Sequence, residues 1–357
     1  MSLIPKKQLL FMPLPELEEY MTAMGEPAYR GRQVYQWIYK RQTGSFYEMS
    51  DLPKSARQKL DEIALISIPR VLKQRAASDG TRKFLLELED KKRIETVVIP
   101  QNDSKTTDYT VCISTQVGCV LGCSFCATGR TGWQRDLLAY EMAGQVLGSE
   151  RELSRRLRTR DRKHITNVVY MGMGEPLLNY DAVIESIIWI NDPKGINIGQ
   201  RHITVSTAGH VPGIRNLAQE GLQVTLAVSL HAADNDLRSR LMPINRKYSL
   251  EKLLAAVEYY LHKTNRRVTF EYIMLEGINI HRHDADNLIR LVKPLLANVN
   301  LIPYNEVEGS GYHRPSRQRI MQFHGWLVQG GLNVAVREEH GREIKAACGQ
   351  LHLRKAK

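Results

Sequence analysis

The apolar positions in the last two thirds of the chain alternate between two spacings. Short runs rich in β-branched residues, typical of buried strands, are separated by longer stretches with the apolar spacing of helices. This pattern predicts an α/β fold in which a parallel sheet with helices outside curves into a partial (β/α)6 TIM-like barrel. The expected strands are residues 109–114, 165–171, 202–206, 223–229, 268–274 and 299–303, with an edge strand at 333–337. The expected helices are residues 138–150, 180–191, 212–220, 249–263, 284–296 and 315–329.

The N-terminal part of the chain has a helical pattern of its own. Residues 1–62 are amphipathic, and Val34, Trp37 and Ile38 fall on one helical stripe. Basic and aromatic side chains interleave along the same segment, which fits either a face that contacts RNA or a packed helix with solvated Arg and Lys. These side chains are Arg30, Arg32, Tyr35, Trp37, Tyr39, Lys40 and Arg41. We expect a helical accessory domain here.

Between these two parts the apolar spacing shortens to that of strands. Residues 83–89 and 94–100 flank a polar turn and predict a hairpin, and the polar residues 101–108 form a natural boundary. Glu95 lies within the second strand, where the pattern predicts a side chain that faces solvent. We therefore divide the chain into a helical RNA-contacting domain, a small β extension and a barrel domain. Their ranges are residues 1–62, 63–104 and 105–357.

Polar residues gather after the ends of the predicted strands. In barrels of this kind the reacting groups lie where strands end and loops begin, so these loops together indicate a site. Gly174 permits close approach of the backbone to a ligand, and Glu175 can accept hydrogen bonds from an ammonium group. Ser206 and Ser229 suit a carboxylate or a ribose, and Asn305 suits an adenine edge. The alternative role of the two serines is to cap the next helix.

Three cysteines lie close together in the first of these loops. Thiolates are soft ligands, and the spacing of Cys119, Cys123 and Cys126 suits one metal centre. A cubane of four irons needs four ligands, so three cysteines leave one iron free to chelate the amino and carboxylate groups of S-adenosylmethionine (SAM). An electron from the cluster then cleaves the sulfonium and yields a carbon radical. The alternative is a zinc knuckle whose fourth ligand lies elsewhere in the chain.

The charge of the chain indicates a class of partner. There are 50 Lys and Arg against 38 Asp and Glu, and the net charge of +12 favours a polyanionic partner, nucleic acid first. The run Arg151–Lys163 is a candidate phosphate contact and otherwise a solvated face. His281, His283 and Asp284 are expected in a solvated loop, with Asp284 in the first turn of the next helix, rather than at a metal.

The composition also excludes some classes. No apolar run approaches the roughly 20 residues of a membrane span, and the N-terminus lacks the pattern of a secretory signal. Five cysteines, three of them clustered as expected ligands, fit a reducing cytoplasm better than a disulfide scaffold. The patterns alone give no task to the other two, Cys112 within a strand and Cys348 near the C-terminal end.

Several motifs of this chain occur together in one known family. They are Gln116-Val-Gly-Cys119-x-x-x-Cys123-x-x-Cys126-Ala-Thr-Gly129, Gly172-Met-Gly-Glu-Pro176, Ser229-Leu-His-Ala232, Ala347-Cys348-Gly-Gln-Leu351, Gly25-Glu-Pro-Ala-Tyr-Arg30 and Trp37-Ile-Tyr39. With them the chain resembles, over essentially its whole length, the radical SAM RNA methyltransferases of the RlmN and Cfr family, and it is most similar to the RlmN branch.

The resemblance implies a barrel of the radical SAM type and methylation of carbon 2 of adenine in 23S ribosomal RNA and in the tRNA anticodon loop. It implies a [4Fe-4S] cluster on the three clustered cysteines and two equivalents of SAM per turnover. The implied partners are large-subunit ribosomal RNA, tRNA and an electron donor such as flavodoxin, for a cytoplasmic monomer without membrane association. The family's SAM contacts match Gly174, Glu175, Ser206, Ser229, Leu230, His231 and Asn305.

The resemblance also gives a task to three residues that the patterns do not select. Carbon 2 of adenine is not nucleophilic, so direct displacement on a sulfonium methyl should fail. In the family, the cysteine matching Cys348 is methylated first and delivers its carbon to the base, and the thiol matching Cys112 releases the product through a transient disulfide. Glu95 matches the family's proposed proton acceptor.

Three alternatives stay open at this point. One is the same chemistry at carbon 8 of the ribosomal adenine, as in Cfr. Another is a radical enzyme that acts on a small molecule, which would leave Cys112 and Cys348 without a task. A third, of a different class, is a non-catalytic RNA-binding module stabilised by zinc.

Overall fold

One mixed sheet organises the computed structural model, which describes residues 6–101, 108–157, 164–337 and 340–351. Its strands are β3 (Arg70–Ala76), β4 (Arg82–Glu87), β5 (Arg93–Pro100), β6 (Tyr109–Cys112), β9 (Ile165–Tyr170), β10 (Ile203–Thr207), β11 (Thr225–Ser229), β12 (Val268–Met274), β13 (Ala297–Pro303) and β14 (Val334–Val336). Their order in the described part of the chain is β14-β13-β12-β11-β10-β9-β6-β5-β4-β3. Neighbours from β14 to β6 are parallel, and neighbours from β6 to β3 are antiparallel.

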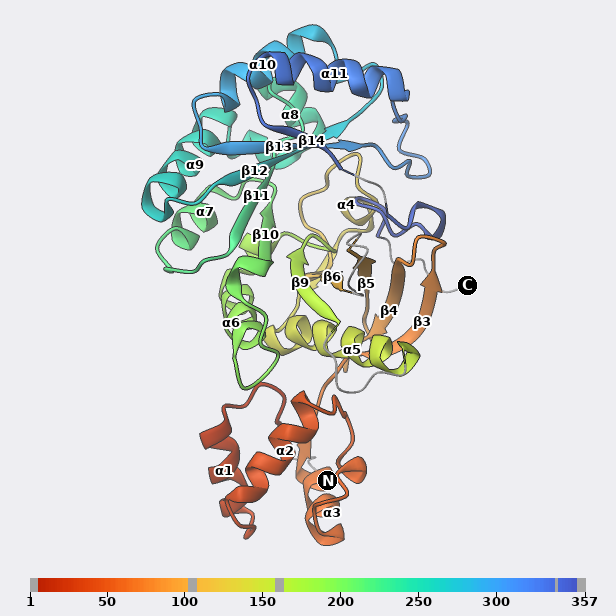
Figure 1. Cartoon of the computed structure of the whole chain (residues 1–357), viewed down its shortest axis with the longest axis vertical. Coiled ribbons are helices and arrows are strands. Elements are labelled where there is room, and N and C mark those ends of the chain that lie inside the picture. Colours follow the sequence, from red (N-terminus) through yellow and green to blue (C-terminus); the bar gives the residue numbers. More distant parts are fainter. Residues whose placement is uncertain (1–5, 102–107, 158–163, 338–339, 352–357) are drawn as a thin grey trace.

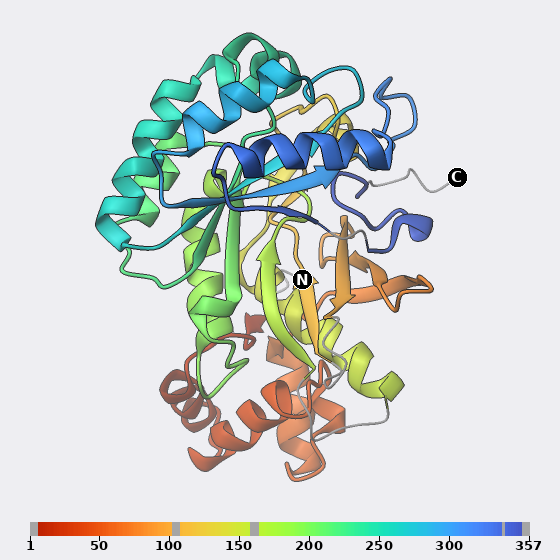
Figure 2. The ribbon, with the colours of Figure 1, turned by 45° about the horizontal axis from the view of Figure 1, so that its top comes forward.

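Helices cover the outer face of the parallel strands (Figures 1 and 2). They are α5 (Ala139–Leu157), α6 (Tyr180–Asn191), α7 (Val211–Leu217), α9 (Leu250–Thr264), α10 (Arg282–Val292) and α11 (Arg317–Gln329). Strands covered on both faces bury consecutive side chains, as Leu226, Ala227 and Val228 of β11 do. The order begins at β14 and ends at β3, so the described sheet is an open, partial barrel. This confirms the predicted fold class and the predicted alternation of strands and helices.

The antiparallel strands continue the barrel sheet. Val97 of β5 pairs with Cys112 of β6, and β4 and β5 form the predicted hairpin. The expectation that Glu95 faces solvent is wrong, because its side chain is buried in this extension at 7% exposure. The pattern failed here because the strand has one face on α5 and the other on the C-terminal segment, so both faces are covered (Figure 1).

The N-terminal segment folds as short helices at one end of the molecule (Figure 1). Its elements are β1 (Lys7–Gln8), α1 (Leu14–Ala23), α2 (Tyr29–Tyr39), η1 (Phe46–Glu48), α3 (Lys54–Ile63) and β2 (Ala64–Leu65). The ring of Phe11 stacks on Trp189 with centroids 4.7 Å apart, and Tyr35 donates a hydrogen bond of 2.8 Å to Asp192. Since α6 runs antiparallel to the strands, these contacts join the segment to the amino ends of the strands.

Two of the three aromatic side chains of the basic and aromatic N-terminal face are buried, and the third, Trp37, is half-buried. Tyr35 and Tyr39 belong to the core, so the alternative of a packed helix holds for them. Arg32, Lys40 and Arg41 are exposed, and they stay candidates for contact with RNA. The remaining basic run, Arg151–Lys163, falls partly outside the described residues.

Several elements were not predicted. They are β7 (Gln116–Gly118), α4 (Ala127–Thr131), β8 (Trp133–Asp136), α8 (Asn235–Leu241) and the 3-10 turns η2 (Pro176–Leu178), η3 (Gln200–His202), η4 (Pro243–Arg246) and η5 (Arg342–Ile344). The cysteine loop therefore follows β7, which pairs with β8, rather than the first barrel strand directly. Each of these elements has seven residues or fewer, too short for its apolar spacing to stand out.

The start of α10 agrees with the prediction. Asp284 lies in its first turn, accepts a hydrogen bond of 2.8 Å from the backbone N–H of His281, and completes a capping box. His281, His283 and Asp284 do offer ligand atoms within 4.8 Å of one another, but the cap accounts for their arrangement. None of the helices in the described ranges is both long enough and apolar enough to span a membrane.

The contact of α6 with the N-terminal helices can be tested by mutation. Trp189→Ala removes a half-buried ring that stacks on Phe11, and we expect the free energy of unfolding to fall by about 2–3 kcal/mol. Ile188→Ala on the same helix is the control, because Ile188 is 55% exposed and its loss should change stability by less than about 0.5 kcal/mol. Denaturant unfolding followed by circular dichroism measures both. Equal effects of the two variants would contradict the contact.

Candidate active site

The cysteine loop is held from both sides. The N–H of Cys119 donates to the carbonyl of Gly132 at 3.1 Å, next to the pairing of β7 with β8. Further along, the N–H of Ser124 donates to the carbonyl of Leu241 at the end of α8, at 3.0 Å. Gly118 has φ +83°, and a Cβ at this position would collide with the carbonyl oxygen of Gly132. Glycine is therefore required where the chain enters the loop.

The three cysteine side chains face the same interior. Cys119 and Cys123 are buried and Cys126 is half-buried. Burial raises the pKa of Cys119 to about 12 and that of Cys123 well above its usual value. Cys126 and Cys119 add to the rise at Cys123, so the three thiols lie close enough to interact electrostatically.

Glu175 is a buried carboxylate at the end of β9. It accepts hydrogen bonds from the backbone N–H groups of Ala208 at 2.7 Å and Leu177 at 3.1 Å. Burial raises its pKa to about 7, although these hydrogen bonds act in the opposite direction. The described residues give it no cationic partner. A ligand ammonium group would supply that charge. Gly174 precedes Glu175 with φ +103°, and a Cβ there would collide with Gln116 and Thr115, so the close packing of this turn requires glycine.

Two more polar side chains lie at the ends of neighbouring strands. The side-chain oxygen of Asn305, after β13, is buried and has no hydrogen-bond partner in the described structure. His231, after β11, is buried with φ +59°, and burial lowers its pKa to about 3, so its ring is neutral. Its Nδ1 accepts from the N–H of Ile273 at 3.1 Å, which leaves Nε2 as a donor. Ser206 and Ser229 do not cap helices, since His210 and Asp234 occupy those positions.

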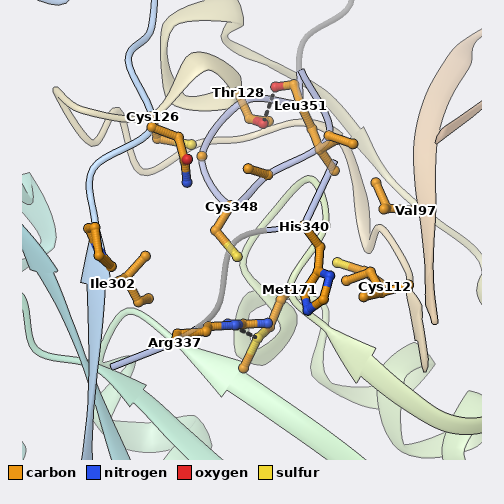
Figure 3. A pocket seen from close by; sticks show the side chains of 17 residues that line it. Val97, Cys112, Cys126, Thr128, Met171, Ile302, Arg337, His340, Cys348 and Leu351 are labelled. Carbon is orange, nitrogen blue, oxygen red and sulfur yellow. Dashed lines mark hydrogen bonds between the residues drawn. The ribbon is translucent and has the colours of Figure 1, made fainter. Parts of the chain in front are cut away.

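A cavity at the same edge of the sheet brings the remaining thiols together (Figure 3). Its empty volume, counted to the open mouth, is about 770 Å³. Cys112 from β6, Cys126 from the cysteine loop and Cys348 from the C-terminal segment line it together with Asn305. The cavity therefore joins residues from both ends of the barrel domain. Gly174, Glu175, Ser206, Ser229, Leu230 and His231 lie at the same strand ends but do not line this cavity.

The C-terminal segment, residues 340–351, is fixed in place by contacts along its length. Gly341 donates from its backbone to Asp79 at 2.9 Å, and Lys83 donates to the carbonyl of Lys345 at 2.9 Å. Past Cys348, the N–H of Ala127 donates to the carbonyl of Gly349 at 2.8 Å. These bonds set the segment between the β3–β4 turn and the cysteine loop, and they hold Cys348 at the cavity.

Glu95 lies beside this segment. Its carboxylate pairs with Lys83 at 3.0 Å, and both side chains are buried. Glu95 does not line the cavity, but Val97, two residues along on the same face of β5, does. Lys83 thus contacts the carboxylate and the segment that carries Cys348 at once.

Comparison with known proteins identifies the family. The family model described as the radical SAM superfamily matches residues 113–289, and the model described as the ribosomal RNA large subunit methyltransferase N-terminal domain matches residues 7–66. A probable dual-specificity RNA methyltransferase RlmN from Syntrophomonas wolfei is 60% identical over 351 residues, which cover 98% of each chain. The protein of the same name from Moorella thermoacetica is 47% identical over 95% of each chain. A radical SAM methyltransferase from Sphaerobacter thermophilus has a TM-score of 0.90 at 43% identity and covers 97% of this chain and 99% of its own.

The chain belongs to the RlmN family of radical SAM RNA methyltransferases. The predicted family is thereby confirmed, and the zinc-stabilised non-catalytic module is excluded as its class. Membership of the radical SAM superfamily implies a [4Fe-4S] cluster and SAM. The residues present fit both groups. Buried thiols with raised pKa values become thiolates when they bind iron, and the unpaired carboxylate and amide at the rim match the polar groups of SAM.

Sequence reasoning missed one residue of this RlmN-family site that the structure makes prominent. Arg238 of α8 is fully buried, and its guanidinium donates to the carbonyls of Ala208, Ser229 and Leu230 at 2.7, 3.1 and 3.0 Å. Burial lowers its pKa to about 10, while nearby Cys123 raises it. This side chain ties the ends of β10 and β11 together beside Ser229 and Leu230, two of the predicted SAM contacts. Nothing in the sequence distinguishes it from the solvated arginines of a short helix.

The requirement for glycine before the predicted cluster ligands can be tested by mutation. Gly118→Ala should displace Cys119, because its Cβ would collide with the backbone of Gly132, and the purified protein should hold at most about a tenth of the usual iron and sulfide. Gly122→Ala is the matched control. It has φ +64° and no atom within 4 Å of the added Cβ, so it carries only the backbone strain of about 1 kcal/mol. Iron and sulfide analysis after anaerobic purification measures both, and a full cluster in Gly118→Ala would contradict the steric argument.

Proposed function

We propose that this chain methylates carbon 2 of adenine in 23S ribosomal RNA and in the tRNA anticodon loop, through a methylated cysteine and a transient disulfide. One observation carries the proposal. Cys112 and Cys348, which belong to distant segments and are not cluster ligands, line one cavity beside Cys126 of the cluster loop. A small-molecule radical enzyme would need neither thiol. The dual specificity in the names of the relatives agrees with two RNA substrates.

The cofactors supply what the side chains cannot. Cys119, Cys123 and Cys126 would hold the cluster, the rim residues would bind SAM, and with two SAM equivalents per turnover these groups supply the methyl carbon and the radical that activates it. The binding positions are Gly174, Glu175, Ser206, Ser229, Leu230, His231 and Asn305. The electron donor would be a small carrier such as flavodoxin.

The chain's own residues handle the carbon and the protons. Cys348 carries the one-carbon unit as a thioether and presents it to the base. Glu95 accepts the proton from carbon 2 once the new carbon–carbon bond has formed, and the cluster, when bound, would take back the one electron that the radical adduct releases. Cys112 then attacks the sulfur of Cys348: a disulfide forms, the sulfur–carbon bond breaks, and the electron pair and the thiol proton complete the methyl group on the adenine. One thiol and one thioether thus become one disulfide and one methyl group.

Replacement of Cys348 and of Cys112 should block the reaction at different steps. Cys348→Ala should abolish RNA methylation because no carrier exists, while SAM is still cleaved. Cys112→Ala should leave RNA attached covalently to the protein, because nothing displaces the sulfur–carbon bond. Gel electrophoresis detects the adduct, and mass spectrometry of nucleosides from both RNAs identifies the methylated carbon. Methylation by Cys348→Ala would refute the mechanism, and a methyl group on carbon 8 would favour the Cfr-type alternative.

We further propose that residues 1–62 contact RNA away from the reacting base. The exposed side chains Arg32, Lys40 and Arg41 lie on a domain that packs at the amino ends of the strands, opposite the cavity edge. The base has to leave its stack to enter the cavity, so a second contact would have to come from a distant part of the same RNA. We expect a folded RNA of tRNA size to reach both positions and an isolated anticodon hairpin to reach only the cavity.

Charge reversal tests this arrangement. The triple variant R32E/K40E/R41E should weaken binding of full-length tRNA about tenfold or more at low salt and reduce the salt dependence, but leave binding of an isolated anticodon stem-loop unchanged. K252E/K263E/R267E, with the same charge change on α9 and at the start of β12, is the control and should retain tRNA affinity. Filter binding at several salt concentrations measures each. Equal losses for tRNA and stem-loop would place the contact at the cavity instead.

A further inference from the structure

One charged side chain that lines the cavity, Arg337, has no role in the proposed chemistry so far. Arg337 follows β14, and its backbone N–H donates to the carbonyl of Leu301 at 2.8 Å, which fixes it beside β13. Its side chain turns inward and lines the cavity together with Cys112 and Cys348. Figure 3 shows the guanidinium beneath the sulfur of Cys348, which points toward it.

The other contacts of this guanidinium leave it available. Glu271 of β12 lies 3.9 Å away, beyond hydrogen-bond distance, and the other oxygen of that carboxylate accepts from Asn300 at 3.0 Å. Nη1 also lies 3.8 Å from the sulfur of Met171, a weak acceptor. The attraction of Cys348, and then of Glu271 and Cys112, raises the pKa of Arg337, so the half-buried guanidinium stays charged.

The thiols beside it need such a charge. Only a thiolate is a good nucleophile, and burial raises the pKa of Cys112 to about 12, with Arg337 acting in the opposite direction. Cys112 has to attack sulfur and Cys348 has to take up a methyl group, so both must lose a proton inside the cavity. Besides the two thiols, the titratable or charged groups of the described structure that line the cavity or pair with Arg337 are Glu271 on β12, Cys126 on the cysteine loop and His340 on the C-terminal segment.

We propose that Arg337 is a positioning residue that stabilises the thiolate forms of Cys112 and Cys348 and so lets both act near neutral pH. Glu271 weakens this stabilisation, because its negative charge cancels part of the positive potential of Arg337 at the thiols. The inference rests on the proposed function, since only the cysteine-based route uses these two thiolates. It assigns a role in that route to the last strand of the sheet.

The test measures thiol reactivity directly, on the cluster-loaded full chain without RNA or SAM. Iodoacetamide alkylates thiolates, and peptide mass spectrometry gives the rate at Cys348 and at Cys112 separately as a function of pH. In Arg337→Gln the pH of half-maximal rate should rise by about 1–2 units, so the rate at pH 7 falls about 10- to 100-fold. Arg337→Lys, which keeps the charge, should lie between this variant and the parent.

Glu271→Gln distinguishes electrostatics from structure. Removal of the carboxylate should lower the pH of half-maximal alkylation, the opposite of the effect of Arg337→Gln, whereas loosening of the fold would move both variants in the same direction. Arg337→Gln leaves the Glu271 carboxylate buried without a nearby cation. If that variant does not fold, the double variant E271Q/R337Q replaces it. Both groups are then neutral, and the pH of half-maximal alkylation should still rise. Arg314→Gln, at a neighbouring arginine that does not line the cavity, is the control and should behave as the parent.

An unchanged pH profile in Arg337→Gln and in the double variant, or shifts of the same sign in Arg337→Gln and Glu271→Gln, would overturn the proposal. The result of the alkylation test can be distinguished from the result of the methylation test of the proposed function. If the alkylation profiles shift as expected while Cys348→Ala still methylates RNA, the thiolate effect stands and the cysteine-based route fails.

Discussion

Desolvation of charged and nucleophilic groups at one edge of the sheet is the constraint on which the site depends. Cys123, Glu175 and Arg238 are all removed from water there, and burial shifts the pKa of each toward its neutral form. Removing such groups from water costs folding free energy unless a partner is supplied. A cluster and a sulfonium ligand would bring the missing charges, so part of their binding free energy would offset this cost. The apolar core of the barrel stabilises the fold enough to carry the remaining cost of burying these groups.

The β extension and the C-terminal segment complete the walls of the cavity at that edge. Hairpin β4–β5 is continuous with the barrel sheet through β6, so Lys83 and Glu95 lie at fixed positions relative to Cys112. The C-terminal segment then crosses from this hairpin to the cysteine loop, and its hydrogen bonds at both ends hold Cys348 between them. Segments more than 200 residues apart therefore depend on one another. A change in the hairpin that moved Lys83 would also displace the segment that carries Cys348.

Much of this architecture follows from local patterns, and the rest depends on long-range contacts. The spacing of apolar residues and of cysteines predicts the six barrel strands, their helices and the cysteine loop. Because reacting groups of such barrels lie where strands end, the sequence also predicts Glu175 and Asn305 at one rim. Glu95 looked solvated because its covering segment comes from the other end of the chain. Arg337 carried a faint signal, a charged residue at the end of the predicted edge strand, which the same rule would have selected. Lys83 and Arg238 carried none, since only tertiary packing buries them.

The different burial of the two free thiols fits the tasks assigned to them. Cys348 is half-buried at the cavity, so it can meet both a bound cofactor and an incoming base. Cys112 lies within a central strand at 8% exposure, so it is less exposed than Cys348. A thiol that acts only after transfer gains from this position, because burial slows premature alkylation and oxidation. Burial also raises the pKa of Cys112, and the cationic side chain of Arg337 in the same cavity acts against this rise.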